Sequence, residues 1–415
     1  MQTTRRAVMS TGLAMLAAGT SRAQTSAPVT LQFWEGHSLQ EETATIRMIA
    51  AFEESHPDIK IQRTKVAFGT NFEKMTTAVA SGDLPDVTPI WGGFLPQFAQ
   101  AGTLNDLRKY GVEAIAPSVY PAAWSYGLVN GGIYGVPYAL DPRFLAMNGP
   151  ALAEAKVSAP ATLDELYSVA KALTKRSGDT IARYGIGFAS QEELRNAFLN
   201  FLYAYGGSAL NADETAVTLD TPEGIAAGEL MGRLVHDGYA TSGLPVDELR
   251  HALLGGRVAM MIDGPWILYA DSNMDQPIAV DVAPIPPGKA GGKLINVGTV
   301  GDYVVWHKSK YPDQAATFVK WMASPEAQQF RVQLLKTSVA PAVVEKPFAK
   351  QVFAKWPQLE TVQGYTKDSI IYPVQAKWSR IVDALQPAVE AIVSGSDPKT
   401  ALAEASRQAT RALRR

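Results

Sequence analysis

The chain has 415 residues, more than one domain usually holds, and its contents of 47% hydrophobic and 19% charged residues are those of a soluble globular protein. Its formal net charge of −2 gives no electrostatic reason to expect nucleic acid or an anionic membrane as partner, which favours a small molecule. The absence of cysteine excludes disulfides, thiol catalysis, zinc–thiolate sites and lipid attachment through an N-terminal cysteine, and it suits an oxidising compartment.

The N-terminal residues predict an export signal. Thr4-Arg5-Arg6 is a twin-arginine sequence, an apolar stretch follows over residues 7–18, and Ser21-Arg22-Ala23 places small residues where a signal peptidase cleaves. The apolar stretch is shorter than the roughly 20 residues that span a bilayer. We therefore expect a Tat-type signal peptide over residues 1–23, a mature protein that begins near Gln24, and a periplasmic location. The alternative is a cytosolic N-terminal helix.

The mature chain opens with the pattern of a β-α-β unit. Val29, Leu31 and Phe33 alternate with polar residues, which predicts a strand. Residues 41–55 carry apolar side chains at helical spacing, and His56-Pro57-Asp58 ends that helix because proline lacks an amide N–H. A second apolar strand follows. The pattern indicates an α/β fold in which helices cover a sheet.

Further helices follow the same pattern along the chain. Residues 71–81 and 94–101 predict two helices, with a short strand between them near Val87. Near the C-terminus, residues 377–394 present one apolar face, and Pro387 inside this segment should kink or break the helix.

Two extended segments that contain proline, near residues 138–142 and 281–287, lie far apart in the sequence. A chain that crosses twice between two lobes has this pattern, and each crossing is a candidate hinge strand that can absorb a rotation of one lobe against the other.

Five stretches carry motifs that occur in the same order in one known family. They are Leu31–Trp34 with Phe52–Ile59, Ser81–Val87, Tyr134–Tyr138 with Asn148, Gly256–Met260 with Gly264-Pro265-Trp266, and Phe318–Ala327. Together they resemble the family 1 extracellular solute-binding proteins, the group that includes maltose-binding protein, over nearly the whole mature chain.

This resemblance implies a type II periplasmic binding protein fold. Two α/β lobes, each a mixed sheet flanked by helices, would be joined by hinge crossovers and would hold a ligand in the cleft between them. We expect residues 28–138 and 285–335 in the first lobe and residues 142–281 and 338–415 in the second. The resemblance further implies the membrane permease of an ABC importer as partner. We expect a monomer, no cofactor, no metal and no catalytic residues.

Residues at strand exits are candidates for ligand contact. A sugar presents apolar C–H faces and hydroxyl groups, which suit aromatic rings and polar side chains. Trp34, Glu35 and His37 follow the first strand, at the edge where open α/β sheets bind ligands. Trp91 follows a strand and precedes two glycines. Thr70 follows another strand. Each of three candidates has a structural alternative: Thr70 would cap a helix, Trp34 would lie in the core, and His37 would be an ordinary surface residue.

The first crossover supplies three more candidates, Tyr138, Asp141 and Arg143, because crossover residues face the floor of a cleft. A structural salt bridge between Asp141 and Arg143 is the alternative. The resemblance assigns further contacts to the family's stacking tryptophan, a glycine-rich turn whose N–H groups donate, polar groups of the second lobe and a C-terminal contact loop. The stacking tryptophan corresponds to Trp266 and the glycine-rich turn to Gly298 and Thr299. The polar groups of the second lobe correspond to Arg195 and Asn196, and the contact loop to Tyr372.

The predicted function is capture of a sugar or sugar derivative for an ABC importer. His37, Arg143 and Arg195 would make the pocket partly cationic, which permits a uronate, a sulfonated sugar glycoside or a glycerophosphodiester without requiring one. A glycerophosphodiester- or glycerol-3-phosphate-binding protein is therefore one alternative. A secreted glycoside hydrolase, with Glu35 and Asp141 as its two carboxylates, is another. A sensory role would use the same fold. The sequence lacks a GxGxxG motif and metal-ligand spacing among its five histidines, which argues against an oxidoreductase.

Overall fold

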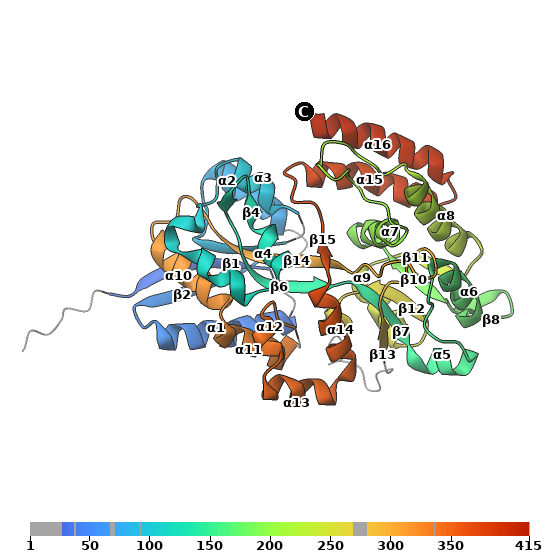
Figure 1. Cartoon of the computed structure of the whole chain (residues 1–415), viewed down its shortest axis with the longest axis horizontal. Coiled ribbons are helices and arrows are strands. Elements are labelled where there is room, and N and C mark those ends of the chain that lie inside the picture. The colour runs from blue at the N-terminus through green and yellow to red at the C-terminus, as the bar shows by residue number, and fades with distance from the viewer. Residues whose placement is uncertain are drawn as a thin grey trace, which may run out of the picture.

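The chain forms two sheets that lie side by side as two lobes in a computed structural model (Figure 1). The structure describes residues 27–36, 39–66, 71–91, 93–268, 280–335 and 337–414, so the predicted signal peptide lies outside the described residues. The six-stranded sheet of the first lobe has the order β15-β14-β3-β1-β2, with β6 paired to β14. Its strands are β1 Val29–Glu35, β2 Ile59–Lys65, β3 Val87–Trp91, β6 Val136–Pro142, β14 Val297–Val305 and β15 Ile370–Ile371.

Helices cover both faces of this first sheet, and the alternation of side chains along β14 shows why. Tyr303 and Val305 enter a core with β1 and the helices α1 and α10, while Val300 and Val304 enter a core with α3 and α4. The helical segments of the first lobe are α1 Leu39–Ser55, α2 Asn71–Ser81, α3 Leu95–Gln100, η2 Leu107–Tyr110, η3 Val112–Ser118, α4 Pro121–Tyr126, α10 Pro312–Met322, α11 Pro325–Leu335 and α12 Pro341–Val344. A two-stranded sheet pairs β4 Leu128–Val129 with β5 Gly132–Ile133.

The second sheet has five strands in the order β11-β10-β12-β7-β13. They are β7 Phe144–Asn148, β10 Ile186–Ala189, β11 Ala240–Leu244, β12 Met260–Asp263 and β13 Val280–Ala283. Leu145 and Met147 of β7 pack under α6, α7, α8 and α15, whereas Phe144 and Ala146 pack against α9. The helical segments of the second lobe are α5 Gly149–Ala155, α6 Leu163–Leu173, α7 Glu192–Ala204, α8 Pro222–His236, α9 Val246–Leu254, η4 Pro265–Leu268, α15 Trp378–Val393 and α16 Pro398–Arg414, with a hairpin of β8 Lys175–Ser177 and β9 Thr180–Arg183.

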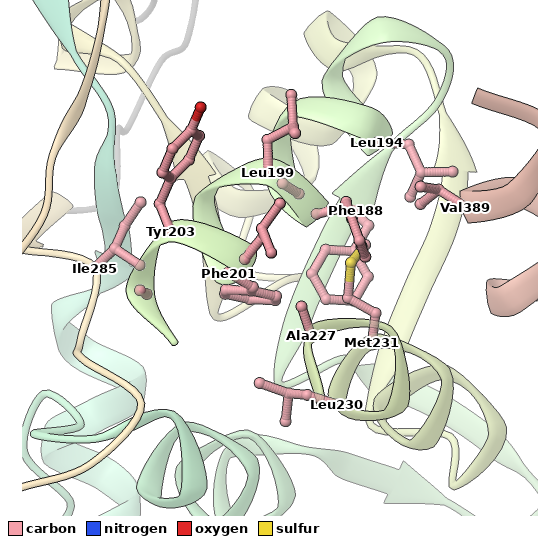
Figure 2. Packing of buried hydrophobic residues seen from close by; sticks show 14 of the residues in the cluster. Phe188, Leu194, Leu199, Phe201, Tyr203, Ala227, Leu230, Met231, Ile285 and Val389 are labelled. Carbon is pink, nitrogen blue, oxygen red and sulfur yellow. The ribbon is translucent and has the colours of Figure 1, made fainter. Parts of the chain in front are cut away.

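The larger core of the second lobe is built around aromatic and aliphatic side chains of β10, α7 and α8. Figure 2 shows Phe188, Phe201 and Met231 gathered in it, and the two phenylalanine rings meet edge to face at 6.1 Å between centroids. Leu194 of α7 lies beside Val389 of α15, so the C-terminal helices are part of this core (Figure 2).

The chain passes between the two lobes three times: from β6 to β7, from β13 to β14, and from β15 to α15. Between the lobes lie α14 Pro357–Lys367 and, below it in the view, α13 Pro347–Lys355 (Figure 1). The placement of β15 differs from the expectation that residues 338–415 belong to the second lobe. Ile370 and Ile371 pair with Val297 and Gly298 of β14, because that edge of the first sheet offers unpaired backbone groups.

Of the two outcomes expected of Pro387, a kink or a break, the break does not occur: the helix α15 continues through this residue. Proline removes one helical hydrogen bond and costs about 3 kcal/mol in a helix interior. The helix buries Trp378, Ile381, Leu385 and Val389 on one face, and this tertiary packing outweighs that cost. None of the helices in the described ranges is long and apolar enough to cross a membrane.

Candidate functional site

The crossing strands β6 and β14 bring three of the predicted site residues together. Asp141 lies opposite Thr299, and Pro142 lies opposite Gly298, in antiparallel register. A Cβ atom on Gly298 would stand 2.5 Å from Leu140 Cδ1 and 3.1 Å from Ser369 Cβ, so the packing at this position favours glycine. The predicted residues Asp141, Gly298 and Thr299 therefore meet where the chain leaves the first lobe.

Asp141 is buried, with 3% of its surface exposed. The Thr337 hydroxyl hydrogen-bonds to its carboxyl group and accepts a hydrogen bond of 3.3 Å from Arg331 Nη2. Burial raises the pKa of Asp141 to about 6, and the charge of Arg331 offsets only part of that effect. The alternative Asp141–Arg143 ion pair does not form among the described residues, because Arg143 pairs with Glu193.

The raised pKa of Asp141 predicts a stability that falls between pH 4 and pH 6. Below pH 4 the carboxyl is protonated in the folded and the unfolded chain; as the pH rises, the unfolded chain releases the proton first and is favoured. A shift from 3.8 to about 6 corresponds to about 3 kcal/mol. We expect the gain in unfolding free energy from Asp141→Asn to be larger at pH 7 than at pH 4 by about that amount, as measured by urea denaturation.

The exposed Asp83 provides the control for this experiment, since Asp83→Asn changes the same net charge without removing a buried carboxyl. Equal pH dependence of wild type and Asp141→Asn would mean that Asp141 is ionised at no unusual cost.

A second group of predicted residues meets in the second lobe. With their ion-pair partners they form a cluster that we call the second-lobe wall: Arg143, Glu192, Glu193, Arg195, Asn196, Arg250, Asp263, Trp266 and Tyr372. Arg143 is the single residue between β6 and β7, and its Nη1 and Nη2 lie 2.9 and 3.0 Å from the Glu193 carboxylate oxygens. The Arg143 guanidinium lies over the ring of Trp266, 4.8 Å from its centroid. The Arg250 guanidinium lies 5.6 Å from the same centroid. Burial lowers the pKa of Arg143, but Glu193 and Asp263 outweigh it and the pKa stands above its ordinary value. Arg143 therefore stays charged.

The same wall includes the predicted residues of α7 and the C-terminal segment. The Tyr372 hydroxyl donates to Asn196 Oδ1 at 3.3 Å, and Asn196 Nδ2 lies 3.5 Å from Glu193 Oε2. Arg195 lies 3.7 Å from Glu192, and its buried Nε has no hydrogen-bond partner among the described residues. Glu193 thus joins Arg143, Asn196 and Tyr372 in one polar network.

Trp91 and Tyr138 lie on the first lobe. Trp91 ends β3 and meets Tyr138 edge to face at 5.2 Å, while Tyr138 stacks on Tyr303 at 4.0 Å and is fully buried. The Trp91 ring lies over Gly301, where an added Cβ would stand 2.7 Å from it. Its buried Nε1 has no hydrogen-bond partner within the described ranges. Trp91 therefore keeps a donor to offer, whereas the ring of Tyr138 is enclosed in the core.

Trp34 and Glu35 have their described contacts inside the first lobe. The Glu35 carboxylate is buried and accepts a hydrogen bond of 2.6 Å from Arg63 Nε, and Lys74 Nζ lies 4.2 Å from the centroid of the Trp34 ring. The Glu35 carboxylate is thus buried and engaged by Arg63, which weakens the hydrolase alternative because a catalytic carboxylate must reach the substrate. Two predicted residues, His37 and Thr70, lie outside the described residues.

The structure adds residues that the sequence analysis missed. Glu193, Asp263 and Arg331 are partners of predicted residues, and only Asp263 had a local signal, its position directly before the Gly264-Pro265-Trp266 motif. Trp378 is 2% exposed and touches the first lobe at Gly93, where an added Cβ would stand 2.2 Å from its Cδ1. This contact holds the start of α15 against the first lobe.

Within the described ranges, no three histidine, aspartate or glutamate side chains gather as ligands for a metal ion. The side chains of the site can instead form hydrogen bonds and stack on rings: they include guanidinium, amide and indole N–H groups, hydroxyls, carboxylates and the partly exposed tryptophans Trp91 and Trp266.

Comparison with known proteins places the chain in a wider group. The family described as bacterial extracellular solute-binding protein matches residues 36–329. The maltotriose-binding protein of Pyrococcus abyssi is 25% identical over 337 residues, which cover 80% of this chain and 70% of that protein.

Two solved structures share the fold at low sequence identity. The ABC substrate-binding protein Lmo0181 of Listeria monocytogenes, in complex with cycloalternan, superposes with a TM-score of 0.81 at 22% identity, covering 92% of this chain and 98% of its own. UgpB of Mycobacterium tuberculosis, in complex with glycerophosphocholine, superposes with a TM-score of 0.82 at 18% identity. The match covers 94% of this chain and 99% of that protein. These likenesses confirm the predicted two-lobe α/β fold.

Proposed function

This chain belongs to the bacterial extracellular solute-binding proteins, and from that premise we propose that it captures a neutral sugar for an ABC importer. The ligand would sit between the lobes, with Trp266, Arg143, Arg195 and Asn196 on one side and Trp91 on the other. The protein would reach the periplasm through its Tat-type signal and deliver the ligand to a membrane permease.

The observation that carries the proposal is a set of buried N–H groups without partners. Within the described ranges these are Trp91 Nε1, Arg143 Nε and Nη1, Arg195 Nε and Arg331 Nε, which belong to both lobes and to the crossing between them. Arg143 Nη1 is ion-paired with Glu193 but makes no hydrogen bond. A buried donor without an acceptor costs free energy, and nearly all buried donors in proteins have a hydrogen-bond partner. These N–H groups therefore point to a ligand that supplies acceptors. Hydroxyl and ring oxygens of a sugar are acceptors of the right kind, and the Trp266 ring suits an apolar sugar face.

The balance of charge supports a neutral ligand over an anionic one. Three arginines of the second-lobe wall each have a carboxylate within 4.0 Å: Arg143 has Glu193, Arg250 has Asp263, and Arg195 has Glu192. An anion would meet these carboxylates as well as the guanidiniums, and its desolvation would be poorly compensated. Neutral hydroxyls can use both the donors and the acceptors of such a wall.

Ligand capture would work through closure of the two lobes. A ligand that contacts both lobes stabilises the closed arrangement by its extra contacts there, and only that difference shifts the equilibrium. The three chain crossings are the places where rotation can be absorbed. A wrong ligand would leave buried donors unpaired, which would provide selectivity.

The test is thermal unfolding of the ligand-free mature protein against neutral mono- and oligosaccharides, uronates and glycerophosphodiesters. A ligand present at 100 times its dissociation constant should stabilise the fold by about 2.7 kcal/mol. We expect a raised midpoint with a subset of the neutral sugars. Stabilisation by anions alone would refute the neutral assignment and favour a glycerophosphodiester-binding protein. A lack of any shift, or cleavage of a chromogenic glycoside, would refute the sugar-binding proposal.

A further inference from the structure

The carboxylate of Asp263 gathers the side chains of the second-lobe wall. This residue ends β12 and is fully buried. It accepts hydrogen bonds from Arg250 Nε at 2.7 Å, from Arg250 Nη2 at 3.0 Å and from the Gly264 amide at 2.9 Å. It also accepts a hydrogen bond from Trp266 Nε1, and Arg143 Nη1 lies 3.9 Å away.

These partners come from four different parts of the second lobe. Arg250 lies on α9, Gly264 on the turn after β12, Trp266 on η4, and Arg143 at the crossing from the first lobe. Burial of a carboxylate costs free energy unless several hydrogen-bond donors surround it. Asp263 can therefore stay buried and ionised only while these four segments hold their donors around it. The three residues before Asp263 in β12, Met260 to Ile262, are apolar, which shows that the strand itself does not need a charge.

We propose that Asp263 is a positioning residue for the ligand site, a role that rests on the proposed function because Trp266 and Arg143 are its assigned ligand contacts. The bond to Nε1 fixes the plane of the indole ring and uses its only N–H donor. Trp266 therefore offers a sugar its ring face and carbon edge. The same carboxylate holds Arg250 and Arg143 near the ring, so loss of Asp263 would free the ring and both guanidiniums together.

A structural role and a positioning role can be separated by the choice of variant. Replacement of a buried ion pair by apolar residues of similar size is often neutral or stabilising. The double variant Asp263→Leu/Arg250→Met should therefore stay folded while the Trp266 N–H loses its acceptor. Asp263→Asn retains an oxygen that can accept from Nε1 and serves as the conservative rescue.

The experiment combines two readouts on the mature full-length protein. The first is the ¹⁵N-labelled indole N–H resonance of Trp266 in the ligand-free protein, assigned by Trp266→Phe, with the exposed Trp356 as internal reference. The second is the dissociation constant of the best sugar from the panel, measured by titration calorimetry. Asp247→Asn is the matched control, because Asp247 also pairs with Arg250 at 2.7 Å but is 81% exposed.

We expect the Trp266 indole N–H to exchange slowly in wild type and to move toward the Trp356 position in the double variant. We expect affinity to fall about 10- to 100-fold in the double variant, Asp263→Asn to recover most of it, and Asp247→Asn to bind like wild type. Wild-type affinity in the double variant would overturn the proposal. Should that variant not fold, rapid exchange of the Trp266 N–H in wild type would overturn it just as well. If wild type binds no sugar, the proposed function fails, while the indole resonance still tests the Asp263–Trp266 bond.

Discussion

Replacement of Trp266 by alanine should weaken binding of the sugar ligand about 100-fold, or about 2.7 kcal/mol, and leave both lobes folded. The ring is the partly exposed aromatic group of the second-lobe wall, and two guanidiniums and the Asp263 carboxylate hold it in place. A tryptophan in such a setting provides a large contact area at little entropic cost. Titration calorimetry with the best ligand of the panel measures the change.

Trp356 provides the control for this variant. It is 46% exposed and lies between α13 and α14, outside the proposed site. Trp356→Ala removes the same side chain, and we expect its dissociation constant to match that of wild type within twofold. If the two variants lost affinity equally, or if Trp266→Ala bound normally, the assignment of Trp266 to the ligand would be wrong.

Phe201→Ala should destabilise the second lobe by about 3–5 kcal/mol, because it removes a fully buried ring and leaves a cavity that the core fills only in part. Phe201 packs on Phe188 in the core shown in Figure 2. The free energy of unfolding from urea denaturation, followed by circular dichroism, gives the value.

Ile46→Ala is the comparison for the core variant, since Ile46 is apolar but 45% exposed and should change stability by less than about 1 kcal/mol. A Phe201→Ala protein as stable as wild type would mean that the core has closed around the missing ring.

The sequence alone predicts the architecture well, because the fold depends on local patterns. The alternation of Val29, Leu31 and Phe33 and the helical spacing over residues 41–55 correspond to β1 and α1. The five ordered motifs identify the family, and the match over residues 36–329 confirms it. Local patterns do not predict β15, because a strand of two residues has no periodicity of its own. Its residues are a strand only through their pairing with Val297 and Gly298 of β14.

The candidate site was predictable in part, for a physical reason. Asp141 could be nominated from its place on a crossover and Thr299 from the family resemblance, and the structure makes them register partners of two strands. Glu193 and Asp263 could not be nominated, because their role is to neutralise Arg143 from segments about 50 and 120 residues away in the sequence. A charge partner contributed by a distant element leaves no spacing pattern. The balance of charges around Arg143 is therefore seen only in the folded structure.

The three crossings also constrain how the molecule can be made. β14 joins β3, β6 and β15, yet it is synthesised about 155 residues after β6, and β15 another 65 residues later. A growing chain thus emerges from the ribosome with an incomplete first sheet until nearly nine-tenths of it has been translated, and the apolar edges of β3 and β6 stay open during that time. Neither lobe can be produced as one contiguous fragment. Such a chain suits a secretion route that accepts a finished, folded cargo, which is the route that the Thr4-Arg5-Arg6 sequence predicts.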